Sequence, residues 1–189
     1  ISREIDYYYY KNAQGLSFET IVASGENSSK PHAIPTDRKI QNVDIITIDM
    51  GCKINGYCSD MTRTIFVGQV PEYVKPVYEL VLKNQKQVLQ DMKENANTKQ
   101  IAKMVDNDFK LNNYDLIHAL GHGVGLEIHE GPVLSINSEN ILRENMVVTN
   151  EPGIYIPGQF GVRIEDTVLI TKGGCETLTK SNKNYVIVK

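Results

Sequence analysis

The amino-acid sequence predicts an α+β domain, and three observations lead to this prediction. Two β-rich segments, residues 44–54 and 57–68, are separated only by Asn55-Gly56. Helical periodicity follows over residues 71–95 and again after Asn97. The later segments are β-rich once more and are interrupted by glycines. Strands, then two helices, then further strands are typical of an α+β domain.

The composition excludes several classes of protein. The chain has 189 residues, of which 41% are hydrophobic, and this is enough for one globular domain with a real core. Its formal charge of -3 is small and mixed along the chain, so we expect no nucleic-acid partner. No apolar run approaches the roughly 20 residues of a membrane span, so we expect no membrane partner. The three cysteines, an odd number, indicate reduced thiols in a cytoplasmic protein.

The N-terminal part of the chain is predicted to contain one helix, one strand and a loop. Residues 1–12 resemble the end of a helix whose apolar stripe would be Ile5, Tyr8 and Tyr9. Residues 17–24 alternate well enough for a strand. Residues 24–35 are rich in turn-forming residues and predict a loop.

Two helices are predicted in the middle of the chain. Pro71 suits the first turn of a helix, because a proline there loses no intrahelical hydrogen bond. Asn97 is a good N-cap for the second helix. The apolar positions at helical spacing are Val74, Val77, Tyr78, Val81, Leu82, Val88, Leu89 and Met92 in the first helix, and Ile101, Ala102, Val105 and Phe109 in the second.

The Asn55-Gly56 hairpin predicts a platform with two carboxylates. Both central residues of a type I′ turn need positive φ, which Asn-Gly tolerates. A two-residue turn pairs Asp49 with Thr62 and places Asp60 on the same face, with Cβ atoms roughly 7 Å apart. Two bare carboxylates would repel, and a cation between them removes that cost. The alternative is a solvated face, but Asp49 follows an apolar run, which favours a buried strand end.

Histidines and glutamates in the second half of the chain are also candidates for a site. His118, His122 and His129 lie within one short stretch, and the glycines between them would let the backbone approach a ligand closely. Glu151 follows an apolar strand and precedes Pro-Gly, where the chain turns. Glu165 shares a strand face with Arg163 and Thr167, so an exposed ion pair with Arg163 remains an alternative for it.

One imidazole and four carboxylates therefore form a candidate set of metal ligands: Asp49, Asp60, His122, Glu151 and Glu165. Four carboxylates are too many for a single structural zinc site, which is usually built on cysteine. The set suits two hard or borderline divalent ions, such as Mn²⁺, held about 3.5 Å apart by shared ligands.

At these residues the sequence resembles the metallopeptidase family with the pita-bread fold, which includes methionine aminopeptidases, Xaa-Pro aminopeptidases and prolidases. The matching segments are SFETIVASGENSSKPHAIPTDR, TIDMGCKINGYCSDMTRT, GHGVGLEIHEGP, TNEPGIYIPG and GVRIEDTV, which span Ser17 to about Ile170. The resemblance implies a curved antiparallel sheet covered by helices. PHAIPTDR, CSDMTRT and Arg163 are similar to the Xaa-Pro branch, which implies cleavage of the N-terminal Xaa-Pro bond of peptides with proline in second position, by an Xaa-Pro aminopeptidase.

The resemblance also implies how the metals would be held. Asp49 would chelate one ion, and His122 and Glu151 the other, while Asp60 and Glu165 would bridge the pair. The implied cofactors are two divalent metal ions, with Mn²⁺ as the first expectation and Co²⁺, Zn²⁺ or Fe²⁺ as alternatives for the same ligands.

Roles toward the substrate follow from the same resemblance. His129 would hydrogen-bond the scissile carbonyl oxygen, and His32 and His118 would contact the substrate around the scissile bond and on the leaving side. Glu151 would carry a proton from water to the leaving nitrogen. Arg163 would orient a bridging carboxylate or help to anchor the substrate.

The chain also departs from the family pattern. Residues 1–189 would form the catalytic domain without its first helix and without the N-terminal domain of Xaa-Pro members, and a homodimer is compatible with the resemblance. Four different functions remain open beside the Xaa-Pro aminopeptidase: a methionine aminopeptidase, a prolidase (Xaa-Pro dipeptidase), a non-catalytic peptide-binding relative, and a two-metal phosphatase, which would need a cationic clamp for phosphate.

Overall fold

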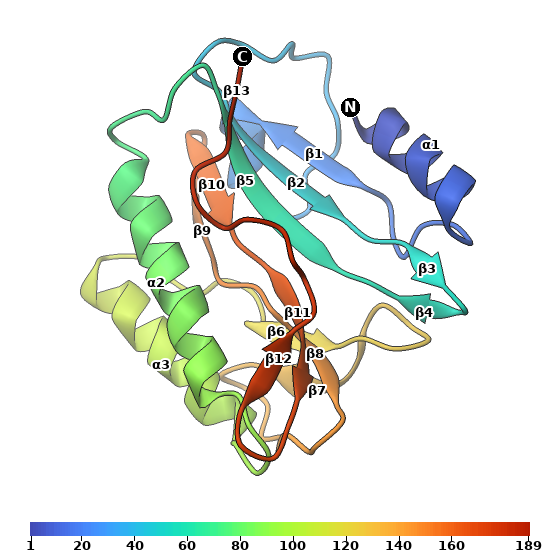
Figure 1. Cartoon of the computed structure of the whole chain (residues 1–189). Helices are drawn as coiled ribbons and strands as arrows, with labels where there is room; N and C mark the ends of the chain where they lie inside the picture. The colour runs from blue at the N-terminus through green and yellow to red at the C-terminus, as the bar shows by residue number, and fades with distance from the viewer.

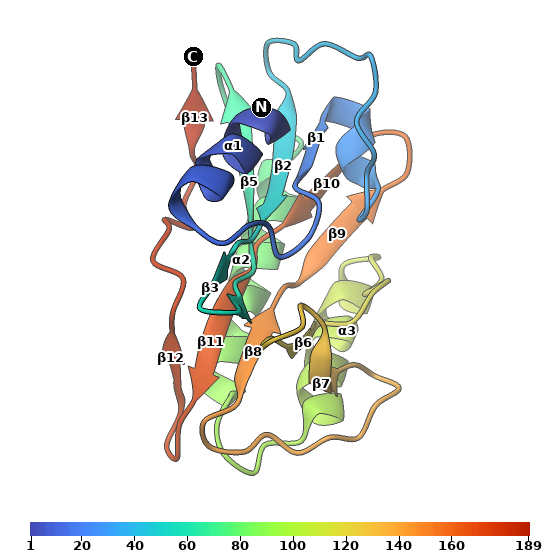
Figure 2. The same cartoon turned by 90° about the vertical axis from the view of Figure 1, so that its right-hand side faces the viewer.

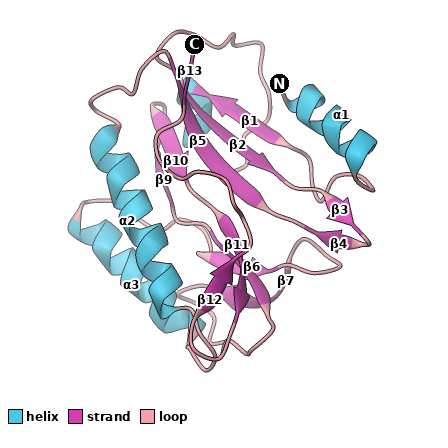
Figure 3. Cartoon of the chain, viewed as in Figure 1, coloured by secondary structure: helices cyan, strands magenta, loops and turns pink.

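The computed structural model describes residues 1–189 and contains three α-helices and thirteen short strands (Figure 1). The helices are α1 (Ser2–Asn12), α2 (Lys75–Asp91) and α3 (Thr98–Leu111), and η1 (Gly25–Ser29) is a short 3-10 helix. Figure 3 shows that the helices lie at the outside and the strands between them. The predicted α+β class is confirmed.

The strands form two sheets and two separate pairs. The first sheet has the order β1 (Ile21–Ser24), β2 (Ile45–Met50), β5 (Met61–Val67) and β13 (Ile187–Val188). The second has the order β12 (Cys175–Thr177), β11 (Asp166–Ile170), β8 (Val147–Asn150), β6 (Gly121–Gly123) and β7 (Glu130–Leu134). The pairs are β3 (Lys53–Ile54) with β4 (Tyr57–Cys58), and β9 (Gly153–Ile156) with β10 (Phe160–Arg163). Every pairing is antiparallel except that of β13 with β5.

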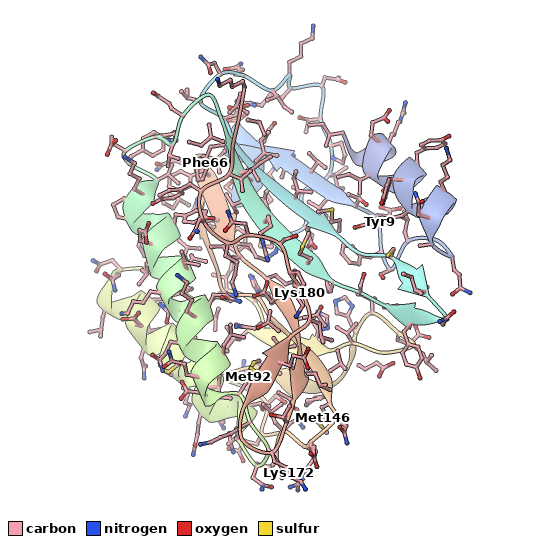
Figure 4. All side chains as sticks on the ribbon, in the orientation of Figure 1. Tyr9, Phe66, Met92, Met146, Lys172 and Lys180 are labelled. Atoms are coloured by element: carbon pink, nitrogen blue, oxygen red, sulfur yellow. The ribbon has the colours of Figure 1, made fainter.

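The two sheets follow one another along the molecule, with α2 and α3 together on one side of the strands (Figures 1 and 2). The apolar faces of α2 and α3 join one hydrophobic core with β5, β8, β10 and β11. Phe66 on β5 packs against Tyr78 on α2 with ring centroids 5.6 Å apart, and Figure 4 shows Phe66 on the α2 side of the strands. The core therefore holds the strands from the side occupied by α2 and α3.

The predicted second helix is confirmed, whereas the predicted start of the first helix is wrong. The Asn97 side chain accepts a hydrogen bond from the backbone N–H of Gln100 at 3.1 Å, as expected for an N-cap. Helix α2 begins at Lys75, and Pro76 is the proline in its first turn. Pro71 lies in the preceding turn, where its carbonyl oxygen accepts from the N–H of Val74.

The N-terminal predictions are confirmed only in part. Helix α1 forms as expected, but it has no buried residue; of the predicted apolar stripe, Ile5 and Tyr9 are half-buried and Tyr8 is 63% exposed. Strand β1 begins at Ile21 rather than Ser17, because the N–H of Ser17 donates to the carbonyl oxygen of Gly51 outside the sheet. The predicted loop after β1 contains η1.

Two further findings concern the chain as a whole. None of the three helices is both long and apolar enough to cross a membrane. Cys52, Cys58 and Cys175 are all free thiols, as predicted.

Candidate metal centre

The hairpin predicted at Asn55-Gly56 is present with the predicted register. Asn55 and Gly56 have φ of 52° and 84°, as a type I′ turn requires. Asp49 pairs with Thr62 across β2 and β5, and Asp60 lies directly before β5. The turn therefore places both carboxylates on one side of the hairpin, as alternation along a strand demands.

Three predicted ligands from distant parts of the chain come together at this hairpin. Asp60 precedes β5, His122 lies on β6, and Glu165 lies between β10 and β11. One ligand atom from each lies within 4.8 Å of the others, and all three residues are buried. Both sheets thus contribute to one cluster of a kind that can hold a divalent cation.

His122 is oriented so that one ring nitrogen faces the carboxylates. Its Nδ1 contacts the carbonyl oxygen of Gly123 at 3.0 Å, and a carbonyl can only accept, so Nδ1 carries the proton. Burial lowers the pKa of His122 and so favours the neutral ring with an unprotonated Nε2, which lies 3.5 Å from Asp60 Oδ2 and 3.3 Å from Glu151 Oε1. A backbone carbonyl that fixes the tautomer in this way is typical of metal-ligating histidines.

Asp49 lies at the edge of this cluster and is held by Arg163. Arg163 Nη2 donates to Asp49 Oδ2 at 2.6 Å, and Arg163 Nη1 donates to the Tyr155 hydroxyl at 2.7 Å. Asp49 Oδ1 is buried and has no hydrogen-bond partner within the chain. A buried carboxylate oxygen without a donor is costly, and a cation would satisfy it.

The carboxylates of the cluster have perturbed protonation. Burial, together with repulsion from Asp49 and Glu151, raises the pKa of Asp60 to about 9. Burial, with a contribution from Asp49, raises the pKa of Glu151 to about 7. Burial and the neighbouring carboxylates also raise the pKa of Glu165 well above its ordinary range. Several carboxyl groups that oppose one another's ionisation fit a site for divalent cations, since cations would reverse each of these effects.

Threonines support three of the glutamate and aspartate ligands. Thr62 donates to Glu165 Oε2 at 2.6 Å, and Thr149 donates to Glu151 Oε1 at 3.1 Å. Thr167 donates to the backbone carbonyl of Asp60 at 2.7 Å. No such role was predicted for them from the sequence. A signal existed, because each threonine lies two residues from a candidate ligand and therefore on the same strand face.

All nine predicted site residues line one cavity of about 900 Å³. They are His32, Asp49, Asp60, His118, His122, His129, Glu151, Arg163 and Glu165. Phe18, Ile21, Ile128 and Val133 add an apolar part to the wall. Arg163 is the only arginine or lysine among the lining residues.

The three histidines outside the cluster differ in what they contact. His118 Nδ1 contacts the carbonyl oxygen of Ala119 at 2.7 Å and Nε2 contacts the Tyr155 hydroxyl at 3.0 Å, so both ring nitrogens are engaged. Burial lowers the pKa of His118 to about 4, and the ring is therefore neutral. His32 and His129 have no hydrogen-bond partner within the chain. The His129 ring packs edge-on against the His122 ring, with ring centroids 4.4 Å apart. Their nitrogens are free to meet a ligand.

Tyr155, which was not among the predicted site residues, joins His118 to Arg163.

The glycines around His122 have a role in strand packing that was not predicted from the sequence. A Cβ atom added at Gly121 would overlap the carbonyl oxygen of Thr149, and one added at Gly123 would overlap that of Gly131. These glycines admit the backbone of the neighbouring strands. The close strand packing is what brings His122 beside Glu151.

Comparison with known proteins agrees with this geometry. The sequence model of metallopeptidase family M24 matches residues 1–172. An Xaa-Pro dipeptidase from Pyrococcus furiosus is 44% identical over 98% of this chain and 54% of its own length. A crystal structure of X-Pro aminopeptidase from Thermotoga maritima superposes with a TM-score of 0.95 at 38% identity, covering 99% of this chain and 54% of that one. Recombinant prolidase from Thermococcus sibiricus gives 0.95 at 40% identity, with coverage of 99% and 52%.

The chain thus spans about half the length of the relatives that it matches. Within that span the family match covers every one of the nine predicted site residues. On this sequence match and the shared fold, the chain belongs to metallopeptidase family M24 and has its pita-bread fold.

Proposed function

We propose that this chain carries the active site of a two-metal peptidase that hydrolyses the bond before proline, with Xaa-Pro dipeptides as its substrates. The observation that supports this most is the meeting of Asp60, His122 and Glu165 within 4.8 Å, inside a cavity also lined by His32 and His129. A cavity of about 900 Å³ beside the ligands has the size of a pocket that binds a small molecule.

The choice of dipeptides rests on the relatives. The sequence favours an Xaa-Pro aminopeptidase over a prolidase, whereas the relatives support the prolidase better. The Pyrococcus furiosus and Thermococcus sibiricus proteins are named Xaa-Pro dipeptidase and prolidase. The Thermotoga maritima structure is named X-Pro aminopeptidase, and it keeps cleavage of longer peptides as the second candidate.

Five residues would hold the metal ions: Asp49, Asp60, His122, Glu151 and Glu165. The ions, which we propose to be Mn²⁺, would supply a water of lowered pKa and positive charge for the developing oxyanion. His122 would bind through Nε2, since Nδ1 is committed to the carbonyl of Gly123. Arg163 would keep Asp49 in place through its 2.6 Å contact.

The remaining residues would act on the peptide itself. His129 would donate a hydrogen bond to the scissile carbonyl oxygen, because its ring nitrogens have no partner within the chain. Glu151 would move a proton from water to the leaving nitrogen, because it lines the same cavity and a carboxylate can accept a proton and return it there.

Recognition of the substrate would involve the other two histidines and the apolar wall. His32 is an exposed part of the lining with free nitrogens and would meet the polar end of the substrate. His118 has both nitrogens engaged, so it would contact substrate through its ring surface. The proline nitrogen in the scissile bond carries no hydrogen and cannot donate a hydrogen bond. The proline ring would therefore be recognised by its shape, through contact with apolar side chains such as Phe18 and Val133.

A phosphatase and a non-catalytic protein are less well supported. A phosphatase would need a cationic clamp, whereas Arg163 is already engaged by Asp49 and Tyr155. A non-catalytic relative would have no need of five converging ligands. A cytoplasmic location and a homodimer remain predictions.

The test is a peptide series with the full-length, Mn²⁺-loaded protein. We expect Leu-Pro to be hydrolysed faster than Leu-Pro-Ala, and both much faster than Met-Ala-Ser. Faster cleavage of Leu-Pro-Ala would favour the aminopeptidase, and faster cleavage of Met-Ala-Ser would favour a methionine aminopeptidase. Binding of two metal ions without any peptidase activity would refute the proposal.

A further inference from the structure

The segment Pro31–Ile40 forms one wall of the cavity and is held unusually loosely. It contributes Pro31, His32, Ala33 and Ile34 to the lining. It contains no helix or strand, and Ala33 is its only buried residue. None of its backbone N–H or carbonyl groups pairs with another backbone group. A segment of this kind depends on side chains to keep one conformation.

The beginning of the segment is tied to the body of the domain by two side chains. Arg163 Nη1 donates to the carbonyl oxygen of Pro31 at 3.3 Å. The buried Asn27 donates through Nδ2 to the carbonyl oxygen of Ile34 at 3.0 Å. These bonds hold the first four residues of the segment but not the rest.

The far end of the segment is tied by Arg38. Its Nη1 and Nη2 donate to the two carboxylate oxygens of Asp44 at 2.7 Å and 2.8 Å, and Nη1 also reaches Ser24 Oγ at 3.3 Å. Asp44 is 6% exposed and directly precedes β2, so it is a firm anchor. Paired, charge-assisted bonds of this kind fix both distance and orientation.

The guanidinium of Arg38 packs directly against the backbone of Gly25. Gly25 has a φ of 54°, and a Cβ atom added there would overlap the guanidinium of Arg38. Asp44 Oδ2 also accepts from the backbone N–H of Gln41 at 2.8 Å, so the carboxylate holds both Arg38 and the residue that follows the segment.

We infer that Arg38 is a positioning residue. Its two hydrogen bonds to the Asp44 carboxylate, called the fork below, hold the segment Pro31–Ile40 at the cavity wall, so that His32 and Ile34 face the peptide. This inference rests on the proposed function, since it names how that substrate is gripped. Without the fork, the segment is tied only at Pro31 and Ile34. Substrate binding would then have to order the rest of the segment, which costs binding free energy.

The kinetic test compares Arg38→Gln, Asp44→Asn and Arg38→Lys in the full-length, Mn²⁺-loaded protein. Arg143→Gln is the matched control, because Arg143 pairs with Asn95 on the exposed surface and does not line the cavity. We expect KM for Leu-Pro to rise about tenfold in the first two variants, with kcat changed less than about threefold and metal content unchanged. Arg38→Lys should give an intermediate KM, because an ammonium cannot form the fork.

A second measurement does not depend on activity. Trypsin can cut after Lys39 in the wild type and in Asp44→Asn, and we expect about tenfold faster cutting there in the variant while its circular dichroism stays native. If the wild type proves inactive, the proposed function fails and this measurement still tests the fork. Unchanged KM in both Arg38→Gln and Asp44→Asn, unchanged cutting, or loss of metal as the cause of lower activity would overturn the inference.

Discussion

Removal of the metal ions should make the stability of the protein fall as the pH rises from about 7 to about 8.5. The physical cause is Asp60, whose pKa is raised from the ordinary value of 3.8 to about 9. In this range the folded chain keeps the proton on Asp60, whereas the unfolded chain has lost it. Because the folded state then binds more protons, its free energy of unfolding must decrease as the pH increases.

The size of this decrease in the free energy of unfolding follows from the one proton that Asp60 keeps in the folded state. A difference of one bound proton changes the free energy of unfolding by about 1.4 kcal/mol per pH unit, so Asp60 alone contributes about 2 kcal/mol between pH 7 and pH 8.5. Glu165, whose pKa is also raised by burial and by neighbouring carboxylates, acts in the same direction. The buried His118 has a lowered pKa of about 4 and acts in the opposite direction, but only below its unfolded pKa of about 6.5.

The assay is urea unfolding followed by circular dichroism, since the chain has no tryptophan. Metal-stripped protein is compared with Mn²⁺-loaded protein at several pH values, and Asp60→Asn in the stripped form is the control. We expect a decrease of about 2 kcal/mol or more in the stripped wild type, a smaller decrease in stripped Asp60→Asn, where Glu165 still contributes, and none of this size in the Mn²⁺-loaded protein. A stripped wild type with the same stability at pH 7 and pH 8.5, or an Asp60→Asn variant with an equal decrease, would refute the reasoning.

Three further predictions concern single substitutions. Glu165→Ala should abolish turnover by removing metal, with the loss visible by elemental analysis; full activity with bound metal would contradict its proposed bridging role. His129→Ala should lower kcat by about a hundredfold while the metal stays bound, and steady-state kinetics alongside metal analysis would check this. Asp166→Asn should destabilise the fold by about 3 to 5 kcal/mol in urea unfolding, because it leaves the buried Arg63, now 2.7 Å from Asp166, without its partner. A change below about 1 kcal/mol would show that this pair matters little.

Much of the local structure could be predicted because its causes are local. The Asn55-Gly56 turn, the pairing of Asp49 with Thr62 and the Asn97 cap follow from φ preferences, strand alternation and unsatisfied N–H groups, all of which act within a few residues. The prediction for Pro71 was wrong because Pro76, five residues later, suits the first turn equally well by the same rule.

The candidate site was only partly predictable in this way. Hairpin geometry brought Asp49 and Asp60 together, but His122, Glu151 and Glu165 entered the set through residue type and family resemblance. No periodicity within a segment specifies that β6 and β8 lie beside the start of β5. Tyr155 and Arg38 were not predicted as site residues, since Tyr155 acts through His118, which lies 37 residues earlier in the sequence, and Arg38 lies in a segment without helix or strand.

The sequence by itself therefore determined the elements, the hairpin register and the identity of the ligand-type side chains. The tertiary structure decided that these side chains share one cavity, that Arg163 holds Asp49, and that the glycines near His122 admit neighbouring strands. The physical reason is the distance along the chain over which each kind of interaction acts. Turn and strand preferences act between adjacent residues, whereas the pairing of distant strands and the burial of charged groups depend on how the whole chain packs.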